Sequence, residues 1–146
     1  MPTVELLRVD DALASALLAG EDPGVPLAEG FPHADTFDGL RMRTADARMF
    51  LALADGVAIG DCGTHGWVDA NGSVEIGYGL AEPWRGRGYG TATVRALVER
   101  LRSDPDVRTL TASVEIANEP SWRLLETLGF TAQSETETTR RYVLEL

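Results

Sequence analysis

A short glycine- and arginine-rich segment is the part of this sequence best suited to bind a ligand. Residues 85–90 read Arg-Gly-Arg-Gly-Tyr-Gly, between an expected strand that ends at Leu80 and an expected helix that begins at Tyr89. Glycines permit positive φ angles and let the backbone come close to a ligand, while the N–H groups at a helix start attract anions. Arg85 and Arg87 add positive charge. The segment therefore predicts a site for a phosphate-bearing ligand.

The charge distribution supports this interpretation. The chain carries 23 acidic and 13 basic residues, a net charge of −10, and all of the basic residues are arginine. Residues 83–103 nevertheless contain five arginines and one glutamate. The acidic remainder argues against nucleic acid and anionic membranes as partners. The lack of lysine excludes Schiff-base chemistry and the Walker A phosphate loop.

Other phosphate-binding motifs fit less well, and a purely structural role for the glycines remains an alternative. The dinucleotide fingerprint needs a third glycine where this chain has Thr91. A turn that merely connects a strand to a helix would also use glycines. Nucleotide binding by the loop is a further alternative.

Cysteine and histidine are too few for the usual structural zinc site, so no metal is expected. Cys62 is the single cysteine, accompanied by His33 and His65. Residues 62 and 65 would point to opposite faces of a strand, which favours a buried cysteine and a surface histidine over a nucleophilic pair. No apolar run approaches the roughly 20 residues of a membrane span, and the acidic N-terminal stretch does not resemble a secretion signal. We expect a cytoplasmic protein.

Hydrophobic periodicity and turn residues predict one α/β domain over residues 1–146. We expect a mixed central sheet with helices on both faces and the element order βααβββαβαββ. A breaker-rich loop over residues 20–35 is expected to select the substrate. The expected elements are a strand over 3–9, a helix from 10 or 11 to 19, a helix over 36–48, three antiparallel strands between 49 and 80, a helix over 89–103, a strand over 110–116, a helix over 119–128 and strands over 130–133 and 140–144.

Three segments, in order, resemble motifs of the GCN5-related N-acetyltransferase (GNAT) superfamily. Residues 85–90 match its R/Q-x-x-G-x-G/A signature, and residues 74–80 resemble the strand before that loop. Residues 118–130 are similar to the N-x-x-S-x-x-x-x-E-x-x-G-F segment of the branch that includes the ribosomal-protein alanine N-acetyltransferases (RimJ/RimL type). The first 70 residues match only in element order.

The resemblance implies acetyl transfer from acetyl-CoA to a primary amine by direct attack in a ternary complex. It implies a small-molecule amine or a peptide N-terminal amine as acceptor, and it allows a homodimer. The backbone of Tyr78 to Leu80 would contact the pantetheine arm and the acetyl carbonyl, and the loop would hold the pyrophosphate. The implied cofactor-binding residues are Tyr78, Gly79, Leu80, Arg85, Gly86, Arg87, Gly88, Tyr89, Gly90, Thr91, Asn118 and Ser121.

Two proton transfers need side chains. An amine with a pKa of roughly 10 is protonated at neutral pH and needs a base, for which we choose Glu75 and, second, Glu115, although both could simply face solvent. The family's tyrosine acid is missing, because its position holds Leu125. The resemblance places Ser121 near the sulfur, with a helix-capping role as the alternative. The missing tyrosine motivates a second hypothesis, a catalytically silent CoA-binding or regulatory domain.

Overall fold

A computed structural model describes residues 2–44 and 47–146 of the chain. Within these residues the elements follow the expected order, and the predicted α/β class is confirmed. A short 3₁₀ helix, η1, is inserted after the fourth strand. The elements are β1 (Glu5–Arg8), α1 (Asp11–Ala19), α2 (Ala34–Arg41), β2 (Met49–Ala54), β3 (Val57–His65), β4 (Ser73–Leu80), η1 (Glu82–Trp84), α3 (Tyr89–Arg102), β5 (Thr109–Glu115), α4 (Glu119–Thr127), β6 (Thr131–Glu135) and β7 (Thr139–Glu145).

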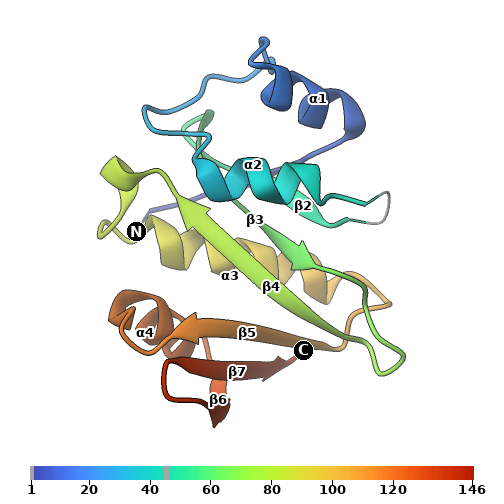
Figure 1. Cartoon of the computed structure of the whole chain (residues 1–146), viewed down its shortest axis with the longest axis vertical. Coiled ribbons are helices and arrows are strands. Elements are labelled where there is room, and N and C mark those ends of the chain that lie inside the picture. The colour runs from blue at the N-terminus through green and yellow to red at the C-terminus, as the bar shows by residue number, and fades with distance from the viewer. Residues whose placement is uncertain (1, 45–46) are drawn as a thin grey trace.

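The strands of the described residues form one seven-stranded sheet in the order β1-β2-β3-β4-β5-β7-β6. Neighbouring strands are antiparallel except β4 and β5, which run parallel. Their pairing covers only Ser73–Glu75 against Thr109–Thr111. Figure 1 shows the two strands close together at their starts and apart at their ends. The sheet therefore has a V-shaped opening between the ends of β4 and β5.

Helices cover both faces of the sheet, as the sequence predicts. One core contains Leu13 and Leu17 of α1 and Leu40 of α2, with Leu51 of β2. A second core on the opposite face joins α3 and α4 to the sheet through residues such as Leu97 and Leu125, together with Leu110 and Tyr142. The alternation of side chains along each strand produces these two faces.

Local signals explain where several elements begin and end. The Asp10 carboxylate accepts a hydrogen bond from the Leu13 N–H at 2.8 Å and caps α1. Asp55 and Gly56 both have positive φ, which a tight two-residue hairpin requires. Gly129 ends α4 with φ 95°.

The predicted helix over residues 36–48 is wrong in its bounds. The helix begins at Ala34 because the ring of His33 accepts from the Thr36 N–H, and it ends at Arg41. Residues 45 and 46 lie outside the described part. Arg48 directly precedes β2 and is already hydrogen-bonded to β3, since its backbone carbonyl accepts from the Thr64 N–H at 3.0 Å.

No helix among the described residues is both long and apolar enough to cross a membrane.

Candidate active site

The opening between β4 and β5 presents backbone groups of β4. The Ala81 N–H donates to the Ile59 carbonyl of β3 at 2.8 Å. Because N–H groups alternate in direction along a strand, those of Tyr78 and Leu80 point away from β3 and toward the opening. The Leu80 carbonyl accepts from Nε of Arg85 at 3.1 Å. This edge of β4 can therefore donate hydrogen bonds to an extended molecule.

The glycine-rich segment follows this edge of β4 after η1. Gly86 and Gly88 have φ angles of 71° and 87°, in the left-handed region that favours glycine. Gly88 is the N-cap residue of α3, and no side chain caps this helix end. The Ala92 N–H donates to the Gly88 carbonyl, so the preceding N–H groups of the first turn lie outside the helical hydrogen-bond pattern. The geometry is that of an anion-binding helix start.

The arginines of the loop are held in place by neighbours. The guanidinium of Arg87 lies 4.8 Å from the ring centre of Trp84 and 5.6 Å from that of Tyr89. Trp84 and Tyr89 meet edge to face at 5.1 Å. Positive charge is therefore positioned beside the uncapped end of α3. Gly90 also serves packing, because a Cβ there would lie 3.1 Å from Leu124 of α4.

The other wall of the opening is the start of α4. Asn118 is its N-cap residue but makes no side-chain cap. Oγ of Ser121 lies 2.5 Å from the hydroxyl of Tyr78, across the opening. The capping role considered for these two residues is therefore not the arrangement in the structure. Burial raises the pKa of the Tyr78 hydroxyl and the hydrogen bond to Ser121 partly offsets this, so the hydroxyl stays protonated at neutral pH.

The sequence named Tyr78 only for its backbone and missed its hydroxyl. The two residues are 43 positions apart. Only the register of β4 and β5 and the position of α4 bring them together, so no local pattern could have revealed the contact.

The two predicted bases lie in different surroundings. Glu75 is half-buried at the last register pair before the opening, opposite Thr111 on β5 and His65 on β3. Glu115 is exposed at the end of β5. Residues 76–84 separate Glu75 from the glycine-rich segment, and the strand part of this stretch, residues 76–80, is about 17 Å long.

A cavity of about 510 Å³ lies on the face of the sheet that α2 covers. Its wall includes the backbone of β4 at Gly77 to Gly79, together with His33, Asp61 and His65. A Cβ on Gly77 would come within 2.0 Å of Nε2 of His65, and one on Gly79 within 3.0 Å of the His33 ring. The two glycines therefore make room for two imidazoles against β4. The sequence offered two reasons for these glycines, backbone exposure and relief of crowding, and both fit this geometry.

Cys62 is not a reactive group of this cavity. Its side chain is 3 % exposed and packs in the core beneath α3. Burial raises the pKa of the thiol, so it remains protonated and unreactive. His65 is exposed. The prediction of a buried cysteine and a surface histidine is confirmed.

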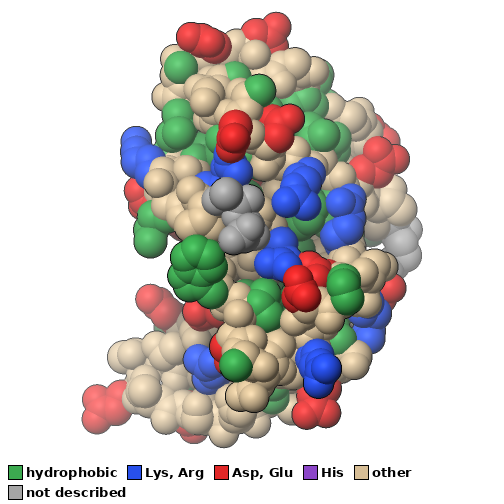
Figure 2. Space-filling view, turned by 90° about the vertical axis from the view of Figure 1, so that its right-hand side faces the viewer, with side chains coloured by type: hydrophobic (Ala, Val, Ile, Leu, Met, Phe, Trp, Pro, Cys, Tyr) green, Lys and Arg blue, Asp and Glu red, His purple; other side chains and the backbone are tan. Residues whose placement is uncertain are grey.

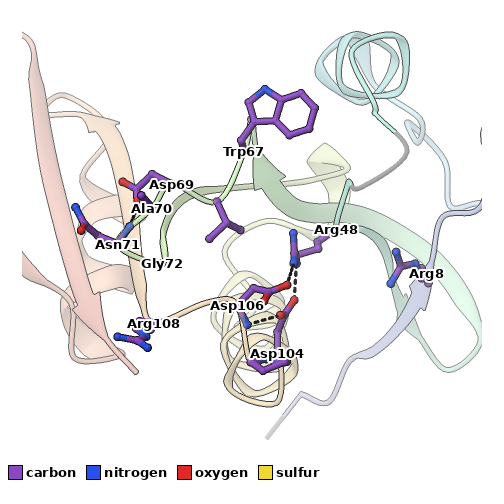
Figure 3. Close-up of a pocket in the computed structure, with 13 residues that line it drawn as sticks. Arg8, Arg48, Trp67, Asp69, Ala70, Asn71, Gly72, Asp104, Asp106 and Arg108 are labelled. Atoms are coloured by element: carbon purple, nitrogen blue, oxygen red, sulfur yellow. Dashed lines mark hydrogen bonds and ion pairs between the residues drawn. The ribbon is translucent and has the colours of Figure 1, made fainter.

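A larger cavity of about 790 Å³ lies near the other end of α3 (Figure 3). Arg8, Arg48 and Arg108 face it, with acidic residues between them. Nε of Arg48 lies 2.5 Å from Asp104, and Nη2 lies 3.6 Å from Asp106. Figure 2 shows arginine and acidic side chains intermixed on this face of the molecule. The charges offset one another, and the 14 residues of α3, about 21 Å, separate this cavity from the glycine-rich segment.

No group of three or more His, Cys, Asp or Glu side chains in the described part of the chain is placed to hold a metal ion.

Comparison with known proteins identifies the class. The family model described as an acetyltransferase (GNAT) domain matches residues 28–131. The chain therefore belongs to the GNAT acetyltransferase family, and the resemblance seen in the sequence is confirmed.

The chain is also similar to individual proteins. An uncharacterized N-acetyltransferase, p20, of Bacillus licheniformis is 35% identical over 72 residues, which cover 49% of this chain but only 40% of that protein. Among solved structures, RimL, a ribosomal L7/L12 alpha-N-protein acetyltransferase in complex with coenzyme A, has a TM-score of 0.73 at 17% identity, over 99% of this chain and 94% of that one. The Campylobacter jejuni N-acetyltransferase PseH in complex with acetyl coenzyme A has a TM-score of 0.67 at 17% identity, over 97% and 98%. At such identities the structures show a shared fold.

Proposed function

We propose that this protein transfers an acetyl group from acetyl-CoA to a primary amine, by direct attack of the amine in a ternary complex. The observation that carries the proposal is the divergence of β4 from β5 after Glu75, directly beside the glycine-rich start of α3. This arrangement joins an edge of free backbone donors to an anion-binding helix end. A molecule with an extended amide-bearing arm and a pyrophosphate matches both.

The described residues fit coenzyme A as a substrate. The N–H groups of residues 86–91, with Arg85 and Arg87, would hold the pyrophosphate. The backbone of Tyr78 to Leu80 and the side chain of Asn118 would hold the pantetheine arm. The RimL structure is a complex with coenzyme A and the PseH structure a complex with acetyl coenzyme A, which supports this assignment.

The reaction forms one bond and breaks another. The amine lone pair forms the C–N bond to the acetyl carbonyl, and the C–S bond breaks with its electron pair leaving on sulfur. Backbone N–H groups of β4 would stabilise the oxyanion that forms between these events. The hydroxyls of Ser121 and Tyr78, 2.5 Å apart, would donate a proton to the leaving thiolate and recover one from the attacking nitrogen, which loses a proton as the amide forms. Since a thiolate has a pKa near 8.5, only modest acid assistance is needed.

The remaining sequence-based expectations stay predictions. They are Glu75 as the base, a single domain over residues 1–146, a cytoplasmic location and a homodimer. The acceptor is either a small-molecule amine or a peptide N-terminal amine, and the RimL relative makes the latter relevant.

The experiment is calorimetric titration with CoA, followed by measurement of free thiol released from acetyl-CoA across a panel of amines. Gly88→Trp should abolish CoA binding by filling the loop. Gly56→Trp is the matched control, because Gly56 also has a positive φ, 80°, has no heavy atom within 4 Å of a Cβ built there, and lies outside the glycine-rich segment. Unchanged CoA binding by Gly88→Trp would refute the loop assignment.

Two alternatives predict different results. A catalytically silent CoA-binding domain, the hypothesis raised by Leu125, would bind CoA tightly without turnover of any amine. A nucleotide-binding loop would give as much thermal stabilisation with ATP or NAD as with CoA.

A further inference from the structure

The cavity beneath α2 contains a carboxylate between two imidazoles, directly behind the edge of β4 described above. Asp61 on β3 is the register partner of Gly79 on β4. His33 precedes α2 and His65 ends β3, and both attract the Asp61 carboxylate electrostatically. Three segments of the chain therefore converge on one wall of the cavity.

One oxygen of Asp61 lacks a hydrogen-bond donor. Its Oδ2 atom is buried and has no partner among the described residues. Thr36 hydrogen-bonds the carboxylate, but burial is the largest influence and raises its pKa. Burying a carboxylate oxygen without a donor is unfavourable, so a ligand donor that reaches Oδ2 as neighbouring side chains move would stabilise the carboxylate.

His33 is already engaged with its neighbours. Its Nδ1 accepts from the Thr36 N–H at 3.4 Å, and its Nε2 faces the β4 backbone at Gly79. Asp61 differs, because its Oδ2 atom has no partner among the described residues.

Position also favours Asp61 over Glu75. Register partners in an antiparallel pair have Cα atoms about 4.5 to 5.5 Å apart, which is the separation expected for Asp61 and Gly79. Glu75 lies four residues before Gly79 on the same strand, about 13 Å away. If the acetyl carbonyl binds at residues 78–80, Asp61 is the nearer of these two carboxylates.

We propose that this cavity receives the acceptor, and that Asp61, rather than Glu75, binds its ammonium group and accepts its proton. This inference rests on the proposed acetyl transfer. The proton passes from R–NH₃⁺ to the Asp61 carboxylate, which leaves a neutral amine and a carboxylic acid. The amine then attacks the carbonyl from the α2 side, while acetyl-CoA approaches from the opening between β4 and β5.

The surrounding charges define the acceptor class. Asp35 and Asp38 also line the cavity. Arg43 lines it as well, but its guanidinium is paired with Asp11. Met42 and Met49 provide apolar wall. The cavity fits a primary amine that is protonated in solution, with a short apolar stem and room for a second positive charge near the acidic rim.

The test compares three variants with wild type, using acetyl-CoA and either cadaverine or benzylamine. Asp61→Asn should lower kcat/KM by about 100-fold, the lower end of general-base effects. It should also remove the rise of rate with pH that ionisation of Asp61 produces. Glu75→Gln should lower the rate by less than about tenfold. Asp55→Asn, the same chemical change on the exposed β2–β3 turn, is the control and should match wild type.

Calorimetric titration with CoA separates the two proposals. The inference is overturned if Asp61→Asn binds CoA and keeps the wild-type rate and pH profile. If wild type binds CoA but acetylates no amine of the panel, the proposed transfer fails, and amine binding decides the inference. Cadaverine should then raise the Tm of the wild-type CoA complex but not that of Asp61→Asn. Equal shifts in both proteins would refute a role for Asp61.

Discussion

Replacing Tyr78 with phenylalanine tests the pair of hydroxyls that Tyr78 and Ser121 form at the start of α4. The change removes the group 2.5 Å from Oγ of Ser121 and keeps the ring, which packs on the core beneath α3 and α4. One partly buried hydrogen bond contributes about 1 kcal/mol to stability. The loss of an acid for a thiolate leaving group should lower kcat by about tenfold, equivalent to about 1.4 kcal/mol of barrier.

The assay is thiol release from acetyl-CoA at saturating amine, with CoA affinity measured in parallel. CoA affinity should stay within about twofold of wild type, because the backbone of β4 is unchanged and a twofold change is only about 0.4 kcal/mol. Ser121→Ala alone and in combination with Tyr78→Phe completes a double-mutant cycle. If the two hydroxyls act as a unit, the double variant should be no slower than the slower single variant.

Tyr142→Phe is the matched control. The Tyr142 hydroxyl also has a partner at 2.5 Å, Glu126, but neither residue is among those proposed to contact coenzyme A or the acceptor. This variant should lose a comparable amount of stability and keep its kcat. Equal kcat in Tyr78→Phe and wild type, or multiplicative effects in the cycle, would refute the proposed proton transfer.

Further predictions concern stability. Arg48 lowers the pKa of Asp104 below its ordinary 3.8, so the stability from this pair is present above that pH and is lost as pH falls through the lowered pKa. Asp104→Asn should cost up to about 1 kcal/mol at neutral pH and flatten this acid dependence, which chemical unfolding at several pH values would reveal. Gly60→Ala should destabilise by more than about 2 kcal/mol, because its Cβ would lie 2.2 Å from the Gly79 carbonyl oxygen. Gly39→Ala, whose nearest neighbour would be a methionine methyl at 3.7 Å, should instead stabilise α2 by about 0.5 to 1 kcal/mol in the same unfolding experiment.

Features that depend on neighbouring residues could be predicted from the sequence. The Asp10 cap, the Asp55-Gly56 turn and the glycine-rich segment before α3 are each encoded within a few residues. They fix the order of the elements and the position of the loop. The helical periodicity of α3 also places Leu97 and Leu101 on its buried face.

Features that depend on sheet register could not be predicted in the same way. Tyr78 and Ser121 meet because β5 leads into α4 across the opening. His33 and Asp61 meet because α2 packs on the face to which Asp61 points. The predicted helix over 36–48 extends beyond the observed end at Arg41 for a related reason. The backbone hydrogen bond between Arg48 and Thr64 competes with the weak helical preference of this segment.

The register of β4 sets the length of the site. Its pairing with β5 ends at Glu75 and the strand ends at Leu80, so the unpaired stretch measures about 17 Å. Each additional residue pair formed with β5 would shorten that stretch by about 3.3 Å. Longer pairing with β5 would therefore close the opening from Glu75 toward Tyr78, whose hydroxyl lies within the unpaired stretch. An arm bound at the anion-binding turn must pass η1 and the end of β4 to reach the hydroxyl pair.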